Sequence, residues 1–224
     1  DWRILGGLAA GYLNGALVTK ARIEPFIVTL AGMFLARGAA FLISTDSVPL
    51  SDPVLSAISS FYIRLPGGGR LTAIAMVMIA VFVVGGILAQ RTRFGANVYA
   101  IGGNVDAAVV SGVTIQRHIV GTYVVSSVLA ALTGILLTAQ VGSGQASFGG
   151  DRMMLQSIAA AVIGGVSLRG GVGRIEIVAV SALFLTILGN ALNLLHVDSR
   201  PQPVFLGVIM VAAVALDELS RRST

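Results

Sequence analysis

Long apolar runs alternate with short polar segments over the whole chain. Hydropathy separates seven apolar segments, at about residues 4–19, 26–44, 71–89, 118–139, 153–167, 174–195 and 203–219. A helix needs about 20 apolar residues to cross the hydrocarbon core of a bilayer, which is roughly 30 Å thick. The segment at 153–167 reaches only about 22 Å, so we expect it to be tilted, or broken and buried among its neighbours. The pattern predicts an all-α, polytopic transmembrane helix bundle with about seven membrane segments.

Composition supports a membrane protein and excludes a nucleic-acid-binding one. The chain is 55% hydrophobic and 11% charged, whereas soluble domains carry about 25% charged residues. Its mean hydropathy is +0.90 and its pI is about 10.4. The basic residues fall singly or in pairs between apolar runs, so they do not form the basic, aromatic-rich face that nucleic-acid binding requires. Without cysteine, disulfides and thiolate metal sites are excluded.

The chain begins at Asp1 without an initiator methionine or a signal-peptide pattern. We therefore interpret residues 1–224 as a single transmembrane domain in a fragment that lacks its N-terminal spans.

The loops on the two sides of the predicted membrane differ in Lys and Arg content, which sets orientation. One set carries nine such residues and the other four. We place the richer set in the cytoplasm, together with the segment 91–117, the turn 167–174 and the C-terminus. The loop 45–70 is then external, and its length predicts a short surface helix around 53–62. The richer set comprises Lys20, Arg22, Arg91, Arg93, Arg117, Arg169, Arg174, Arg221 and Arg222, and the poorer set Arg64, Arg70, Arg152 and Arg200.

Small residues recur at intervals of four inside two apolar segments. Gly7, Gly11 and Gly15 share one helix face, and the series Ala130, Gly134 and Thr138 repeats the pattern. Small residues let helix backbones approach closely in lipid. We expect both faces to pack against other helices, with hinge motion as the alternative role of the glycines.

Polar residues inside the apolar segments have two possible roles. Asn14, Asn190 and Asn193 are predicted either to form interhelical hydrogen bonds or to line a hydrophilic pathway. Arg37 is interpreted as structural, with substrate contact as the alternative. Glu176 is expected to neutralise Arg174 at the interface rather than to carry a proton.

No pattern in the chain predicts catalysis, a metal site or a bound cofactor. His118 and His196 have no matching ligand cluster near them in sequence. The Gly-rich turn at 164–174 has Gly171 after Gly170, where a phosphate-binding loop requires lysine. We therefore predict a transport protein rather than an enzyme, and expect any ATP to be bound by another chain.

Three ordered motifs resemble the ribose/xylose-type permeases of bacterial sugar ATP-binding-cassette (ABC) importers. They are residues 25–38, residues 93–112 and residues 158–171, which together extend the resemblance over nearly the whole chain. The external residues 47–51 and 65–71 further resemble a permease of the galactofuranose importer. The chain departs from the family pattern at Leu155-Gln156-Ser157 and at Ile175–Val178.

The resemblance implies a multi-pass subunit of the bacterial inner membrane that forms a path for a monosaccharide. Its implied partners are a cytoplasmic ABC ATPase, a periplasmic sugar-binding protein and a second permease subunit, identical or paralogous. By the same likeness, part of the segment 91–117 couples to the ATPase through Gly102, Gly103, Asn104, Ala107, Ala108, Ser111 and Gly112. The alternative function is an ion-coupled secondary transporter of a small polar solute, which normally needs buried acidic residues. Only Glu176 and Asp217 approach a predicted span, so the ABC permease is favoured.

Overall fold

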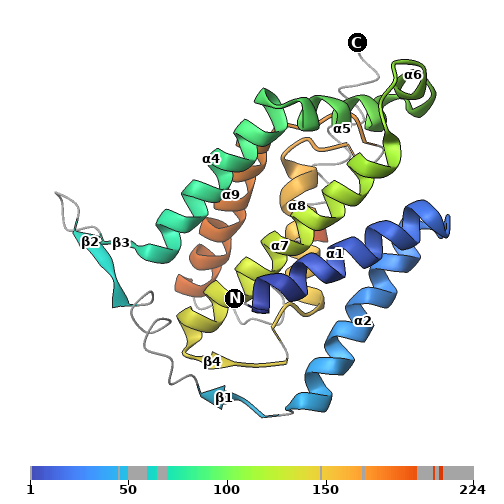
Figure 1. The fold of residues 1–224 in the computed structure, drawn as a ribbon. Coiled ribbons are helices and arrows are strands. Elements are labelled where there is room, and N and C mark those ends of the chain that lie inside the picture. The colour runs from blue at the N-terminus through green and yellow to red at the C-terminus, as the bar shows by residue number, and fades with distance from the viewer. Residues whose placement is uncertain are drawn as a thin grey trace. The chain divides into compact units, whose positions relative to one another are not determined.

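The computed structural model describes residues 2–44, 46–49, 60–64, 70–146, 148–167, 170–195, 204 and 207–208. Helices dominate this part of the chain, and its four short strands form two antiparallel pairs (Figure 1). The elements are α1 (Trp2–Lys20), α2 (Pro25–Ile43), β1 (Val48–Pro49), β2 (Tyr62–Arg64), β3 (Arg70–Thr72), α4 (Ala73–Arg91), α5 (Arg93–Gly103), α6 (Val105–Val110), α7 (Ile115–Val141), β4 (Ser143–Gly144), α8 (Asp151–Ile163) and α9 (Ile175–Leu194).

The predicted all-α membrane fold is confirmed. Among the described residues, α2, α4, α7 and α9 are long and apolar enough to cross a bilayer, and α8 contains a shorter apolar helix. Although α1 is 19 residues long, Arg3, Asn14 and Lys20 interrupt its apolar sequence. The seventh predicted segment, 203–219, lies outside the described residues apart from isolated positions. The expected surface helix at 53–62 also lies mostly outside them, and its last residue, Tyr62, belongs to β2.

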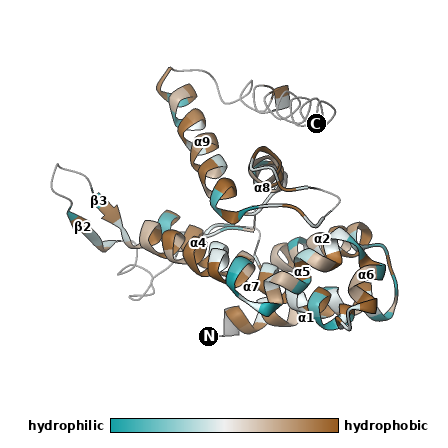
Figure 2. Cartoon of the chain, turned by 90° about the horizontal axis from the view of Figure 1, so that it is seen from above, coloured by the Kyte–Doolittle hydropathy of each residue, from teal (hydrophilic) through white to brown (hydrophobic). Residues whose placement is uncertain are grey.

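Apolar side chains remain uncovered along the spanning helices. At most 11% of the spanning window of any of the four is buried, and Leu42 at the end of α2 is 91% exposed. Hydrophobic residues predominate along α4 and α9 (Figure 2). Exposed apolar area costs about 25 cal/mol per Å² in water, so this surface requires lipid or further helices around it.

The described residues group into two compact units. The first contains Asp1–Val81 and Val109–Gly149, and the second contains Phe82–Ala108 and Gly150–Thr224. The chain passes from one unit to the other three times: within α4, within α6 and between Gly149 and Gly150.

In the first unit, α1 packs against α7 (Figure 1), with its glycine face at the contact. Cβ atoms placed on Gly7, Gly11 and Gly15 would lie 2.7–2.9 Å from atoms of α7, whereas carbon atoms normally pack at 3.5–4.0 Å. Only glycine therefore permits this helix spacing. A Cβ on Gly134 would meet nothing within 4 Å, so within the described chain the predicted second packing face makes no such contact at its glycine.

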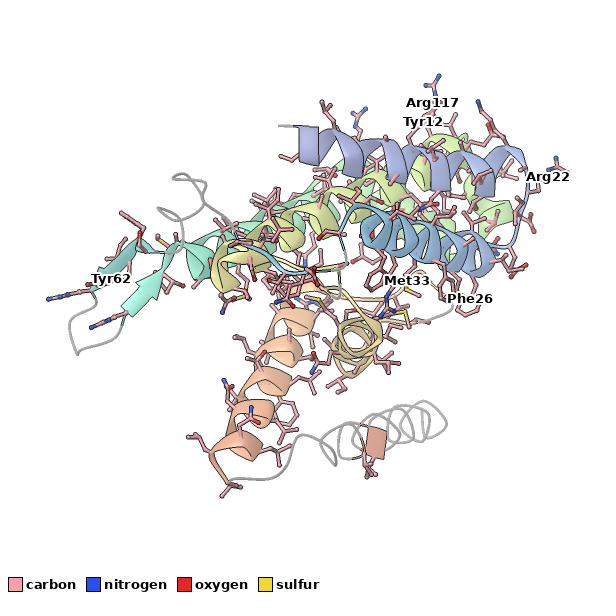
Figure 3. All side chains as sticks on the ribbon, turned by 90° about the horizontal axis from the view of Figure 1, so that it is seen from below. Tyr12, Arg22, Phe26, Met33, Tyr62 and Arg117 are labelled. Carbon is pink, nitrogen blue, oxygen red and sulfur yellow. The ribbon has the colours of Figure 1, made fainter. Side chains whose placement is uncertain are left out.

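In the same unit, α2 packs against α1, and β4 contacts α7. Tyr12 of α1 and Arg117 of α7 lie on one side, and Phe26 and Met33 of α2 project from another (Figure 3). Gly142, with φ of 72°, ends α7 in the left-handed conformation that favours glycine. The chain then enters β4, which pairs with β1.

The strands β2 and β3 pair antiparallel and place two arginine side chains near the ring of one tyrosine. Arg64 and Arg70 are directly opposite each other. Their guanidinium carbons lie 5.9 and 5.0 Å from the ring centroid of Tyr62. Cation–π attraction to the ring offsets part of the repulsion between the two charges.

Candidate coupling surface

The segment that follows α4 turns sharply into α5 at a corner that requires glycine. Thr92 caps α5, because its hydroxyl oxygen accepts a hydrogen bond from the Gly95 N–H at 3.2 Å. The same hydroxyl donates to the Leu88 carbonyl oxygen at 2.5 Å. A Cβ on Gly95 would lie 2.1 Å from the carbonyl oxygen of Ala89. The corner thus fixes the direction in which α5 leaves α4.

Asn104 separates α5 from the short helix α6 and serves both. Its backbone N–H donates to the Ala100 carbonyl, which completes α5. Its side-chain oxygen accepts a hydrogen bond from the Ala107 N–H at 3.0 Å, which is the arrangement of a helix N-cap. Asp106 lies in the first turn of α6, where its negative charge interacts favourably with the positive end of the helix dipole. This segment therefore forms two consecutive ordered helices rather than an irregular loop.

Exposure divides the predicted coupling residues into two groups. Gly103, Asn104, Ala107, Ser111 and Gly112 are exposed, whereas Gly102 is partly covered. Ala108 is only 3% exposed, so it packs within the chain and has little surface for a partner.

Three valines of α6, which were not predicted from the sequence as contact residues, are exposed in the structure. Val105 is 51%, Val109 is 54% and Val110 is 89% exposed. Their apolar character resembles that of the neighbouring spans, so hydropathy alone gave no signal. In the structure they provide most of the exposed apolar side-chain surface of α6.

The Gly-rich turn between α8 and α9 lies against the end of α5. The Ser167 N–H donates to the Val172 carbonyl at 3.0 Å and closes the turn. Gly170 and Gly171 have φ of 90° and 75°, which an L-residue adopts only with strain. A Cβ on Gly102 would lie 2.4 Å from the backbone nitrogen of Gly171. These glycines thus allow direct contact between two backbones.

Two side-chain hydrogen bonds extend this contact toward α9. The Tyr99 hydroxyl donates to the Gly173 carbonyl at 2.8 Å. The Gln90 amide near the end of α4 donates to the Glu176 carboxylate. Neither Gln90 nor Tyr99 was predicted as a site residue, because nothing in the linear sequence connects them with positions more than 70 residues away.

Glu176 also approaches Arg174, as the sequence suggested. The Arg174 Nε and a Glu176 carboxylate oxygen are 3.8 Å apart. Both side chains are more than half exposed, so the pair contributes little stability. At the beginning of α9, Glu176 therefore interacts with two side chains, the Arg174 guanidinium and the Gln90 amide.

An open cavity of about 710 Å³ lies between α4 and α9 in the second unit. Phe82, Val83, Ile87 and Ile175 line its apolar part, and Gln90, Arg91 and Glu176 contribute the polar groups. In the first unit, Arg37 lines a smaller cavity of about 260 Å³ with Met33, Gln145 and Phe148 among its neighbours. Arg37 is therefore at a cavity wall as well as inside a spanning helix.

The three predicted pathway or interhelical asparagines have different surroundings. Asn14 lies against α2, since a Cβ on Gly32 would be 3.1 Å from its side-chain oxygen. Asn190 and Asn193 are exposed on α9. In the described part of the chain, no group of three or more His, Cys, Asp or Glu residues is placed to hold a metal ion.

The sequence matches one protein family over most of its length. The family model described as "Branched-chain amino acid transport system / permease component" matches residues 3–214. No solved structure shows significant similarity to the chain.

Several curated proteins are similar to the chain. The inner membrane ABC transporter permease protein YjfF of Escherichia coli K12 is 43% identical over 75% of this chain and 51% of the relative. The ribose import permease protein RbsC of Bacillus subtilis is 39% identical over 91% and 62%, respectively. The L-arabinose transport system permease protein AraH of E. coli K12 is 36% identical over 97% and 67%. The chain spans about half to two thirds of the length of these relatives.

Proposed function

Because the chain belongs to the permease family described as a component of branched-chain amino acid transport systems, we propose that it is the membrane-spanning subunit of an ABC importer. The proposed cargo is a monosaccharide. The family description mentions amino acids, but relatives that align over more than 90% of the chain are described as permeases for ribose and L-arabinose. The four spanning helices and their uncovered apolar surface support a multi-pass protein of the inner membrane.

The proposed importer needs partner proteins, because the Gly-rich turn lacks the lysine of a phosphate-binding loop. A separate ABC ATPase hydrolyses ATP in the cytoplasm, a binding protein delivers the sugar outside, and a second permease subunit completes the path. The C-terminus lies in the cytoplasm, on the side assigned to the segment 91–117 by the excess of Lys and Arg.

The observation that carries the coupling assignment is the short capped helix α6 with its exposed valines. Asn104 fixes the start of the helix, and Val105 and Val109 lie one turn apart on the same face. An apolar face on an ordered helix outside the spans fits a groove in a protein partner. The contact surface is therefore assigned to the exposed residues of 103–112, with Gly102 and Ala108 supporting it from within the chain.

The contact is tested with the full-length permease and the ABC ATPase encoded beside it. Val105→Glu and Val109→Glu place a charge in the apolar contact and are expected to lower co-purified ATPase by about tenfold, which corresponds to about 1.4 kcal/mol. Val141→Glu is the matched control, because Val141 is 52% exposed at the far end of α7. ATPase retained equally by all three variants would refute the contact.

A second measurement separates this function from ion-coupled transport. Uptake of radiolabelled D-ribose and L-arabinose is measured in vesicles that contain the permease with or without the ATPase. ATP-dependent uptake only in the presence of the ATPase is expected. Uptake driven by a proton gradient without any ATPase would overturn the proposed function.

A further inference from the structure

The Gly-rich turn of residues 164–174 has no role if the ATPase acts on the permease through α6 alone. The turn lacks the lysine of a phosphate-binding loop, yet three of its glycines adopt left-handed φ angles. The turn joins α8 to α9, and one side of it touches the end of α5. Both sides of this contact belong to the same compact unit.

The contact between the turn and α5 is made by backbone atoms. Cβ atoms placed on Gly102, Gly170 and Gly171 would all lie 2.4–3.1 Å from backbone atoms on the other side. A backbone cannot change rotamer to absorb a displacement, so such a contact transmits a push with little loss. The hydrogen bond from the Tyr99 hydroxyl to the Gly173 carbonyl resists separation of the same two elements.

The far side of the turn is joined firmly to two membrane helices. Ile175 begins α9 two residues after Gly173, so α9 continues directly from the turn. α8 packs on α9 at another close approach, where a Cβ on Gly164 would lie 2.8 Å from the Val178 Cα. A displacement of the turn therefore reaches α8 and α9 as a pair.

We propose that Tyr99, Gly102 and Gly171 are positioning residues for transport, which carry the motion of the ATPase-coupling segment through the Gly-rich turn into α8 and α9. This proposal rests on the proposed function, since it requires an ATPase bound at α6. It adds a second route beside the covalent one through the corner at Gly95 into α4. The glycines of the turn thus serve motion between helices and not ligand binding.

The chain offers a closely matched pair of variants. Gly102→Ala introduces a methyl group 2.4 Å from the Gly171 nitrogen, whereas Gly86→Ala introduces one that meets nothing within 4 Å. Gly86 lies in α4 of the same unit, outside the proposed contact surface, so the same residue change is made there without altering the coupling segment. Tyr99→Phe is a third variant, which removes the hydrogen bond and keeps the ring.

The motion is followed on α9 without knowledge of the sugar. Residues 1–224 contain no cysteine, so Val180→Cys adds the one label site within them, on an exposed position of α9. The reconstituted complex of permease and ATPase is compared before and after addition of Mg-ATP with vanadate. Co-purification of the ATPase is measured on the same preparations.

In the otherwise unaltered complex and in Gly86→Ala, trapped nucleotide is expected to change the mobility of the label. In Gly102→Ala the ATPase remains bound, and the change falls by at least about fivefold, the lower end of typical coupling between two sites. In Tyr99→Phe, the change in label mobility is expected to be intermediate between those of the unaltered complex and Gly102→Ala.

Three outcomes would overturn the proposal. These are an equal response in Gly102→Ala and Gly86→Ala, no response of α9 in the unaltered complex, and loss of ATPase binding in Gly102→Ala. Failure of the unaltered permease to bind the ATPase would instead refute the proposed function.

Discussion

Replacement of Gly11 by alanine tests whether the contact between α1 and α7 depends on backbone approach. Gly11 is buried, and an added Cβ would lie 2.7 Å from the Val124 Cα and 2.8 Å from the Tyr123 carbonyl oxygen. Both atoms belong to the backbone of α7, so no side-chain rotation relieves the overlap. Gly134→Ala in α7 is the control, because the same methyl group meets nothing within 4 Å there.

Two opposing terms set the expected magnitude. Alanine is better than glycine in a helix by about 1 kcal/mol, and this gain applies to both variants. At position 11 the Cβ is about 1 Å closer than ordinary carbon packing allows, and overpacking of this kind costs about 1–3 kcal/mol. We therefore expect Gly11→Ala to lose up to about 2 kcal/mol and Gly134→Ala to gain up to about 1 kcal/mol.

The assay is the midpoint of thermal unfolding of the purified full-length protein in detergent. Each kcal/mol corresponds to a shift of about 2–4 °C for a chain of this size. The midpoint should fall for Gly11→Ala and rise for Gly134→Ala at the same scan rate, since unfolding of membrane proteins is often irreversible. A rise in both variants would refute the close packing of α1 on α7.

Three further predictions concern the coupling segment. Gly95→Ala should destabilise the protein by about 3 kcal/mol or more, because its Cβ overlaps the Ala89 carbonyl; the control Gly86→Ala, in open space, should leave the unfolding midpoint unchanged or higher. Asn104→Ala removes the cap of α6 and should increase amide exchange in α6 by an amount that corresponds to about 1 kcal/mol, with exchange in α9 unaltered. A single cysteine at Ser111 should react with impermeant maleimide only in inside-out vesicles and one at Ser47 only in right-side-out vesicles, and the reverse would show that the orientation is inverted.

The helices were predictable from sequence because one physical signal, a run of apolar residues long enough to cross a bilayer, specifies each of them. The glycines were harder to interpret, since their spacing alone does not reveal what they meet. Gly11 and Gly134 both occur in small-residue series with a period of four, yet only Gly11 meets another backbone within the described chain. Periodicity gives the face of a helix, whereas the neighbour on that face depends on the tertiary fold.

The site was predictable only in its location along the chain. Asn104 and Ala108 were assigned together as contact residues, but Ala108 is buried and Asn104 caps a helix. A small residue in a polar segment packs against a partner or against its own chain with equal ease, and sequence does not distinguish the two. The contact of Gly102 with Gly171 joins residues that share no local pattern, so only the fold reveals it.

That contact also bears on topology through an argument independent of charge. The count of Lys and Arg assigned the segment 91–117 and the turn 167–174 to one side of the membrane. Segments on opposite sides are separated by a hydrocarbon core of about 30 Å, so backbones in van der Waals contact must share a side. The approach of Gly102 to Gly171 within one compact unit therefore requires the same pairing of these two loops. Because α7 and α8 lie between the two loops in sequence, a crossing by α7 requires a return through the residues between Val141 and the turn, which include the short α8.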